Sequence, residues 1–255
     1  MLVVERWQKI VQLVNERGSI RVTELSELCQ VTEETIRRDL DKLESEGRLM
    51  RSHGGAVSVK EAQSEVPFME RESAYADFKN SIAKEAVSRI RENDRIILDA
   101  STTAWYMARL IPDMPLTIIT NSIKVALEVS TKEKIQVIST GGLLSPKSLS
   151  YVGPLAERSL DTYHAHKLFL SCKGVHMQRG ISESNELQAL IKQKMISIAD
   201  ETYLLADHSK FGMQSLTQVA GWQDIHYLIT DQQTNTDNVS LIREKGVNVL
   251  QLDRN

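Results

Sequence analysis

Seven short apolar runs in the later part of the chain limit most severely what this sequence can fold into. They are rich in Val, Ile and Leu, and stretches of helical periodicity separate them. The runs occupy residues 95–101, 116–122, 135–142, 167–174, 202–210, 227–231 and 247–252. Strands that are apolar throughout are buried on both faces, and strands that alternate with helices pair in parallel. We therefore expect an α/β domain with a mostly parallel, doubly wound sheet.

Small, hydroxylated or charged residues follow most of these runs, where each expected strand ends. Carboxyl ends of parallel strands meet at one edge of a sheet, where open α/β folds bind ligands. The turn 101–103 precedes a helical stretch, so its hydroxyls and N–H groups suit an anion, best a phosphate. For any single loop, a helix cap or a plain turn is the better explanation. Five runs, however, end in such polar residues, which together favour a ligand site. The expected ligand-binding residues are Asp99, Ser101, Thr102, Thr103, Thr120, Asn121, Gly141, Gly142, Lys173, Asp207 and Lys210.

The segment from residue 22 to residue 55 has a different pattern and is typical of a DNA-binding unit. Apolar positions at helical spacing predict one short helix capped by Thr23 and a second capped by Thr32. Only Gln30 and Val31 remain between the two helices. Such a helix-turn-helix lays its second helix in the major groove of DNA.

The exposed face of the second expected helix carries basic and hydroxyl side chains. Arginine can bind guanine through two hydrogen bonds and so specify a base, whereas lysine and threonine more often hold phosphate. After Gly47, which suits a helix C-cap, the pair Gly54-Gly55 predicts the turn of a β-hairpin wing. The expected DNA-contacting residues are Thr32, Thr35, Arg37, Arg38, Lys42, Arg51 and His53.

The charge of this unit allows a second interpretation. Residues 1–55 hold nine Lys or Arg against ten Asp or Glu, and the spacings Glu34–Arg38 and Arg37–Asp41 also fit an ordinary solvated helix face. A near-neutral unit releases few counterions, so one copy should bind DNA weakly. We therefore expect a homo-oligomer, either a dimer or a tetramer.

The string TEETIRRDLDKLESEGRLMRSHGGA at residues 32–56 resembles the signature of the DeoR family of bacterial transcriptional regulators. The later motifs DASTT, TN, GG and DHSKFG resemble that family's sensor domain, which is similar in fold to ribose-5-phosphate isomerase. The resemblance implies that Thr35, Arg37 and Arg38 contact DNA, supported by Arg51 and His53.

The resemblance has two departures and one finer implication. Ala100 stands where the family commonly has glycine, and Lys167 stands where aspartate is common, which puts a role for position 167 in doubt. Residues 99–113 resemble the segment of family members that govern rhamnose and fucose catabolism. This implies that the effector is rhamnulose 1-phosphate in the first place and fuculose 1-phosphate in the second. Trp105 and Tyr106 are candidates to contact the C6 methyl, although helix aromatics more often belong to the core.

The remaining features concern organisation and cellular place. A length of 255 residues with 41% hydrophobic content fits one small and one larger globular domain. We expect a DNA-binding domain at 1–59, a linker at 60–75 and a sensor domain at 76–255. Charged residues near the start and the lack of a long apolar run indicate a cytoplasmic protein without a membrane partner. The two cysteines form no disulfide framework or zinc motif, and we expect no cofactor and no metal.

The sequence thus predicts a sequence-specific transcriptional regulator, a repressor of a carbohydrate catabolic operon, whose partners are operator DNA and a phosphorylated sugar effector. The alternative is a sugar-phosphate isomerase-like enzyme with an accessory domain, for which Asp99, Glu183, Glu186 and Asp207 offer possible bases. A third alternative is an interaction module with a vestigial pocket. A helix-turn-helix with a wing has no use in an isomerase, so we expect a regulator and not an enzyme.

Overall fold

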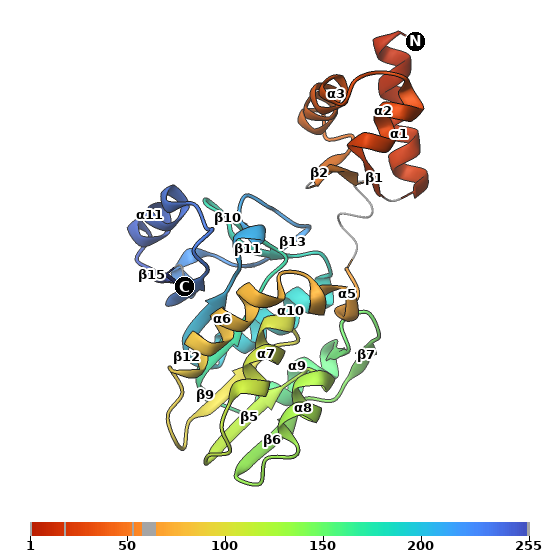
Figure 1. The fold of residues 1–255 in the computed structure, drawn as a ribbon. Coiled ribbons are helices and arrows are strands. Elements are labelled where there is room, and N and C mark those ends of the chain that lie inside the picture. Colours follow the sequence, from red (N-terminus) through yellow and green to blue (C-terminus); the bar gives the residue numbers. More distant parts are fainter. Residues whose placement is uncertain (1, 18, 53, 58–64, 254–255) are drawn as a thin grey trace. The chain divides into compact units, whose positions relative to one another are not determined.

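The computed structural model describes residues 2–17, 19–52, 54–57 and 65–253. Its contacts divide the chain into two compact units, Met1–Ser64 and Glu65–Asn255 (Figure 1). The second unit therefore includes residues 65–75, which the sequence placed in the linker. Each unit has its own core, and each is described by itself.

The first unit is the expected three-helix head with a wing. Its sheet is antiparallel in the order β1-β3-β2, and the first of these strands was not predicted from the sequence. The elements are α1 (Val3–Arg17), β1 (Ser19–Arg21), α2 (Val22–Cys29), α3 (Glu33–Ser45), β2 (Met50–Ser52) and β3 (Gly55–Val57). The helix-turn-helix is confirmed, since α2 and α3 are separated by a short turn.

The ends of the helices in this unit follow local rules with one exception. Thr32 caps α3, because its hydroxyl accepts a hydrogen bond from the backbone N–H of Thr35 at 3.3 Å. Gly47 follows α3 with a φ of +68°, the left-handed conformation that glycine adopts without strain. The expected cap at Thr23 is wrong: α2 begins one residue earlier, after Arg21, whose side chain makes no cap bond.

A buried ion pair joins α1 to α3 in the core of this unit. Asp39 accepts hydrogen bonds from Arg6 Nε at 2.5 Å and from Trp7 Nε1 at 2.7 Å. Val4 is 62% exposed, whereas the charged Arg6 of the same helix is only 9% exposed. The aspartate within the TIRRDL motif is therefore a structural residue, and its charge is unavailable to repel DNA.

The second unit is built on a seven-stranded sheet in which every pair of neighbours is parallel. The strand order is β15-β14-β12-β9-β4-β5-β6. The strands are β4 (Arg95–Leu98), β5 (Leu116–Thr120), β6 (Ile135–Ser139), β9 (Ala165–Leu170), β12 (Ala199–Leu205), β14 (Tyr227–Thr230) and β15 (Asn248–Gln251). All seven apolar runs form strands, and the expected α/β fold is confirmed.

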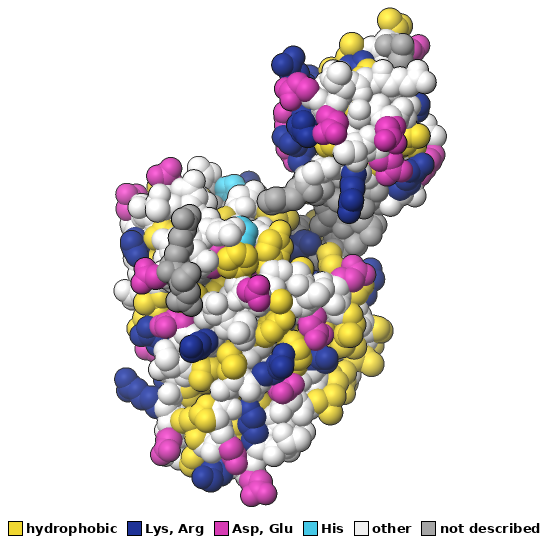
Figure 2. Space-filling model, in the orientation of Figure 1, with side chains coloured by type: hydrophobic (Ala, Val, Ile, Leu, Met, Phe, Trp, Pro, Cys, Tyr) yellow, Lys and Arg dark blue, Asp and Glu magenta, His cyan; other side chains and the backbone are white. Residues whose placement is uncertain are grey.

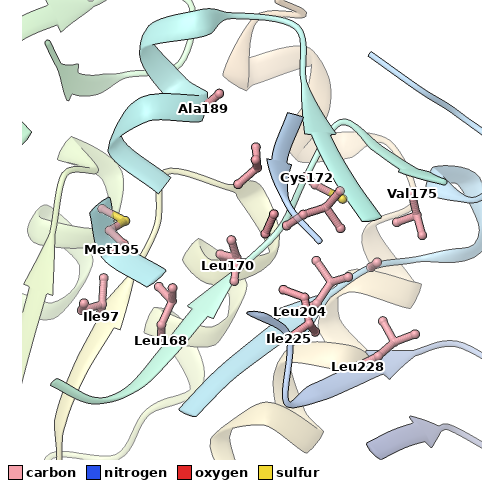
Figure 3. Packing of buried hydrophobic residues seen from close by; sticks show 14 of the residues in the cluster. Ile97, Leu168, Leu170, Cys172, Val175, Ala189, Met195, Leu204, Ile225 and Leu228 are labelled. Atoms are coloured by element: carbon pink, nitrogen blue, oxygen red, sulfur yellow. The ribbon is translucent and has the colours of Figure 1, made fainter. Parts of the chain in front are cut away.

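Helices cover both faces of this sheet, so that alternate residues of one strand enter different cores. In β4, Ile97 belongs to one core, while Ile96 and Leu98 belong to the other. The core on the first face, drawn in Figure 3, lies under α9 (Pro154–Leu160), α10 (Glu186–Ser197) and α11 (Thr236–Glu244). The opposite core lies under α6 (Ala76–Val87), α7 (Thr102–Leu110) and α8 (Ile123–Val129), seen in front in Figure 1.

Several small elements of this unit were not predicted from the sequence. They are α5 (Phe68–Ser73), the hairpin of β7 (Leu143–Ser145) and β8 (Ser150–Val152), the small sheet of β10 (Gly174–His176), β11 (Gly180–Glu183) and β13 (Thr217–Ala220), and two 3₁₀ turns, η1 (His208–Lys210) and η2 (Trp222–Asp224). Phe68 of α5 is 1% exposed and meets Trp105 edge to face, with ring centroids 6.2 Å apart. The segment at 65–73 is thus anchored to the sensor unit.

The strand order fixes where this unit offers a crevice. The chain enters the sheet at β4, proceeds outward through β5 to β6, and then returns to β9 on the other side of β4. The loops that follow β4 and β9 therefore leave in opposite directions. Such a switch in strand order is where open α/β sheets form their ligand sites.

Candidate functional sites: a DNA-reading face and a cationic pocket

The exposed face of α3 presents the residues expected to contact DNA. The hydroxyls of Thr32 and Thr35 lie 3.0 Å apart at the start of the helix. Arg37, Arg38 and Lys42 are exposed along the same helix. His53, expected at the tip of the wing, lies outside the described residues.

Each basic side chain of this face has a carboxylate beside it. Arg37 donates to Glu33 at 2.7 Å, and Arg38 lies 3.4 Å from Glu34. The expected pairing of Arg37 with Asp41 is wrong, because Asp41 instead binds Arg51 of the wing. Figure 2 accordingly shows blue and magenta side chains mixed on the part of this unit where α3 lies.

These ion pairs are exposed, and exposed pairs stabilise a protein by only about 0–1 kcal/mol. Lys42 likewise lies 3.2 Å from Glu46, and both side chains are substantially exposed. DNA phosphates can therefore replace the carboxylates at little cost. The wing is held against α3, since the backbone N–H of Arg51 donates to Glu44 at 2.7 Å.

A cavity of about 90 Å³ lies at the switch in strand order of the second unit. Of the residues expected to bind ligand, five line it, namely Ser101, Thr102, Thr103, Lys173 and Lys210. The other lining residues are Glu65, Val66, Arg71, Lys79, Ser171, Cys172, Glu183, Ser184 and Lys192. Five of the lining side chains are basic.

The start of α7 forms one wall of this pocket. Ser101 caps the helix, because its hydroxyl accepts from the backbone N–H of Ala104 at 3.1 Å. Thr102 and Thr103 follow in the first turn and are almost fully buried. Free N–H groups and the positive end of a helix dipole favour an anion at this place.

Asp99 supports the pocket from below without lining it. This carboxylate is fully buried and accepts from the backbone N–H groups of Ser101 and Ser171, both at 3.1 Å. It thereby ties the loop after β4 to the loop after β9. Asp99 therefore does not reach the cavity wall, and in this structure it positions the two loops.

Lys192 is a buried cation whose charge is balanced. Its Nζ lies 3.1 Å from Asp99 Oδ2 and 2.5 Å from Glu183 Oε1, and it donates to the carbonyl of Ser171 at 2.6 Å. Burial alone would lower the pKa of Lys192, but the two carboxylates outweigh burial and raise it. This lysine is therefore charged, and its three partners hold it in a structural role.

The other cations of the pocket are balanced less well. Lys79 is 3% exposed and donates to the backbone carbonyls of Arg71 and Ala74. Burial, reinforced by the charge of Lys210, lowers the pKa of Lys79 to about 8. Burial and Lys210 also lower the pKa of Lys173. Within the described part of the chain neither Lys173 nor Lys210 forms an ion pair, so the pocket favours an incoming anion.

Four expected ligand residues do not reach the pocket, because they follow β5 and β6 on the outer side of the sheet. Thr120 donates to the carbonyl of Leu98 at 2.7 Å, and Asn121 donates to that of Tyr151 at 2.9 Å. Gly141 and Gly142 have positive φ, and a Cβ at Gly142 would lie 2.8 Å from that of Ala156. Thr120 and Asn121 thus shape the turn from β5 into α8, and Gly141 and Gly142 shape the turn from β6 into the β7–β8 hairpin.

Asp207 lies close to the pocket but is not among the residues that line it. Its Oδ1 accepts from the backbone N–H of Ser209 at 3.0 Å and so starts the turn that carries Lys210. Its Oδ2 is buried and has no hydrogen-bond partner among the described residues. That oxygen is available to a ligand hydroxyl.

Sequence reasoning missed the basic residues that helices contribute. Arg71 comes from α5, Lys79 from α6 and Lys192 from α10, all far in sequence from the strand ends. A lysine on a helix looks solvated in sequence, and no local pattern separated these three from other lysines. The segment of Arg71 had been assigned to the linker.

The aromatic pair that follows the anion turn belongs to the core. Trp105 is 7% exposed and packs on Phe68, while Tyr106 donates to the carbonyl of Glu72 at 3.1 Å. Neither residue lines the cavity. The expected contact with a sugar methyl is therefore corrected.

Two further groups have no visible reactive role. Burial raises the pKa of Cys172 to about 12, which leaves its thiol protonated and unreactive at neutral pH. Cys29 is also buried.

Among the described residues no three His, Cys, Asp or Glu side chains gather as a metal site would require. Nor does any described helix have the length and apolar character needed to span a membrane.

Two family models match the chain, one in each unit. The DeoR-like helix-turn-helix domain matches residues 6–62, and the DeoR C terminal sensor domain matches residues 75–232. Together they cover the DNA-reading face and most of the sensor unit.

Curated relatives resemble the chain over nearly its whole length. The uncharacterized HTH-type transcriptional regulator YulB of Bacillus subtilis is 57% identical over 98% of this chain and 96% of its own. The L-fucose operon activator of Haemophilus influenzae is 41% identical over 89% of this chain and 91% of its own.

The comparison with solved structures finds weak matches. Ribose 5-phosphate isomerase A from Methanocaldococcus jannaschii is 19% identical, with a TM-score of 0.41, and the match covers 54% of this chain and 55% of that one. A match with so low a TM-score carries no argument about this chain.

Proposed function

The chain belongs to the DeoR family of transcriptional regulators, and we propose that it controls a carbohydrate catabolic operon in response to a phosphorylated sugar. Residues 1–59 bind operator DNA, and the sensor unit, which begins at Glu65, holds the effector. The observation that carries the proposal is the pairing of a helix-turn-helix with a cationic pocket at a switch in strand order.

The geometry of α3 supports operator binding. Arg37 and Arg38 extend into solvent from a helix whose opposite side is anchored by Asp39 to α1. We assign base reading to these two arginines. Phosphate contacts fall to Thr32, Thr35, Lys42, Arg51 and His53.

The balance of charge supports a phosphate as the recognised group of the effector. Shifting a population of heads from about 99% to about 1% DNA-competent requires roughly 10⁴-fold discrimination between the two states, some 5.5 kcal/mol. One neutral hydroxyl contact cannot supply this, whereas charge-assisted contacts to a dianion can. Lys210 and Lys173 supply the cations, Ser101 to Thr103 cradle the phosphate, and Asp207 accepts from a sugar hydroxyl.

We further propose a 6-deoxyhexose phosphate as effector, rhamnulose 1-phosphate before fuculose 1-phosphate. Support comes from the resemblance of residues 99–113 to regulators of rhamnose and fucose catabolism and from the Haemophilus influenzae relative named for L-fucose. Calorimetry compares both compounds with fructose 1-phosphate. Tighter binding of fructose 1-phosphate than of either deoxy sugar contradicts this choice.

The direction of regulation is also part of the proposal. We propose repression that the effector relieves, the usual mode that the family resemblance implies, although the Haemophilus influenzae relative is named an activator. Deletion of the gene should then raise transcription of the neighbouring operon in the absence of the sugar. A fall in transcription on deletion contradicts repression and leaves the regulator standing.

We propose that the sensor unit catalyses no sugar isomerisation. Of the carboxylates that could act as bases, Asp99 and Glu183 are engaged with Lys192, and Glu186 is exposed on α10 and does not line the cavity. Asp207 is bound to Ser209 through Oδ1 only, so it is the carboxylate to test. Ribose 5-phosphate should therefore show no turnover. Turnover that disappears in Asp207→Asn contradicts this.

Binding to a labelled fragment from upstream of the protein's own gene tests the main proposal. The protein should protect a site with two half-sites, because two near-neutral heads must act together to bind firmly. Sugar phosphate should weaken protection and the unphosphorylated sugar should not. Equal responses to both compounds contradict the phosphate sensor, and a lack of protection contradicts operator binding.

A further inference from the structure

Glu65 places a carboxylate in the cationic pocket. It is the first residue of the sensor unit, and its half-buried side chain lines the cavity with Arg71 and Lys192. Asn185 Nδ2 donates to Glu65 Oε2 at 3.2 Å. An acidic group at this place is unexpected in a site for a phosphate, since it repels the ligand.

The cavity is narrow. Sites for small molecules usually enclose about 300–1,000 Å³, whereas this cavity has a volume of about 90 Å³. The residues that narrow it include Glu65 and Val66, which come from the segment before α5 rather than from the sheet.

The hold on Glu65 is weaker than the hold on the residues after it. Phe68 is buried, and its backbone N–H donates to the carbonyl of Lys147 at 2.6 Å. Arg71 Nε donates to the carbonyl of Val66 at 2.9 Å. Burial raises the pKa of Glu65, an effect that Arg71 opposes and Glu183 reinforces. Burial thus disfavours the charged form of this carboxylate, and Asn185 is its side-chain hydrogen-bond partner, so a stronger anion can take its place.

We propose that Glu65 is an internal anion that competes with the effector for the pocket, so that a phosphate dianion displaces it and shifts the chain segment leading to the DNA-binding unit. This inference rests on the proposed sensor function. Because residue 65 directly follows residues 1–64, the displacement acts at the covalent connection between the units. Monoanionic and neutral sugars displace the carboxylate poorly, which makes Glu65 a determinant of specificity.

Thermodynamic linkage ties two measurable quantities together. Suppose that the effector binds only when the Glu65 side chain has left the pocket, which we call the outward state. The apparent affinity for the effector then equals the intrinsic affinity multiplied by the fraction of molecules in the outward state. A substitution that favours the outward state should therefore raise effector affinity. It should also move ligand-free operator affinity toward the liganded value.

Glu65→Gln in the full chain tests this, because it removes the charge and keeps the shape. Calorimetry with inorganic phosphate and with ribose 5-phosphate should show affinity higher by about tenfold or more, the change that about 1.4 kcal/mol gives. Operator affinity without ligand should match that of the wild type saturated with phosphate. The control Glu186→Gln, on an exposed carboxylate of the neighbouring α10, should change neither quantity.

Asn185→Asp tests the same idea from the other partner. Aspartate keeps the acceptors that cap α10 at Leu187 and Gln188 but replaces the donor to Glu65 with a like charge. Added negative charge by itself weakens phosphate binding. Tighter phosphate binding by this variant therefore points to release of Glu65.

The outcomes separate the two levels of the proposal. Phosphate bound equally by wild type and Glu65→Gln overturns the competition and leaves the sensor pocket standing. Tighter phosphate binding with unchanged operator affinity overturns the relay to the head. Weaker ribose 5-phosphate binding by Glu65→Gln makes Glu65 a ligand contact, which also overturns the proposal. Failure of both proteins to bind either anion overturns the sensor function and this inference with it.

Discussion

The basic side chains of α3 and those of the sensor pocket differ in how their charge is balanced. On α3, Arg37 and Arg38 pair with carboxylates one helical turn away, in full contact with water. In the pocket, Lys79 is buried and Lys173 is half-buried, both near Lys210, and their pKa values are lowered. The first arrangement is neutral and easily exchanged, whereas the second stores repulsion that an anion relieves.

This difference assigns different tasks to the two regions. Exposed pairs rearrange at little cost, so the head can exchange carboxylates for DNA phosphates without a change of fold. Buried cations cannot rearrange freely, so their unfavourable charge is available as binding free energy for one small anion. Lys192 is the exception in the pocket. It is buried, but Asp99 and Glu183 balance its charge, so its role is structural.

Lys192→Met should have the largest effect, because it leaves two buried carboxylates without their cation. Breaking a buried ion pair costs about 3–5 kcal/mol, and denaturant unfolding of the full chain should show a loss of that order. The control Lys194→Met removes an exposed pair with Asp161 and should cost no more than about 1 kcal/mol. Equal losses in the two variants contradict the contrast between buried and exposed pairs.

Lys210→Ala should leave ligand-free operator binding intact and abolish the response to effector. Loss of a charge-assisted hydrogen bond costs about 1.5–3 kcal/mol, roughly 10- to 100-fold in effector affinity. Thr102→Val should act in the same direction through the anion turn. The exposed Lys245→Ala serves as control. A Lys210→Ala protein that responds normally removes the phosphate contact from the mechanism.

Arg37→Ala and Arg38→Ala should each weaken operator binding. The expected cost is about 1–3 kcal/mol, with relaxed specificity at one base pair, if the arginine reads a base. A phosphate contact lowers affinity for all sequences alike and flattens the salt dependence. Arg17→Ala, which removes an exposed pair on α1, is the control. Unchanged affinity in both variants and in the double variant contradicts the assignment of α3.

The pH dependence of phosphate binding gives the smallest expected effect and tests Lys79. Its pKa is about 8 without ligand, and a bound dianion favours the charged lysine, so binding above pH 8 takes up a proton. Affinity should be highest below pH 8, where Lys79 is already charged. It should fall as the pH rises above 8, by at most about tenfold per pH unit. The ligand for this test is a sugar phosphate, because a phosphate monoester has a second pKa of about 6 and stays dianionic there.

Calorimetry in buffers of different ionisation enthalpy measures this proton uptake directly. The charges that set the pKa of Lys79 are Lys210, Asp207 and Arg71. Lys79→Met should lose the step near pH 8 while Lys245→Ala retains it. An affinity independent of pH between 7 and 9, on the scale set by this shift, contradicts a role for Lys79.

The sequence by itself determined the elements whose signals are local. The stripe of Ile36 and Leu40, the cap at Thr32 and the left-handed Gly47 lie within a few residues of one another, so periodicity and capping chemistry sufficed. The seven apolar runs fixed the parallel sheet for the same reason. The cap of α7 at the turn 101–103 could be predicted because Ser101 adjoins the helix that it caps.

Only the tertiary structure decided which of the strand ends share a site. Since β9 rather than β6 lies beside β4, the turn 101–103 meets Lys173, while Gly141 and Gly142 lie elsewhere. Lys79 and Lys192 reach the pocket from helices on opposite faces of the sheet. Strand order and helix packing depend on contacts between residues far apart in the chain, and no local pattern of residue types records them.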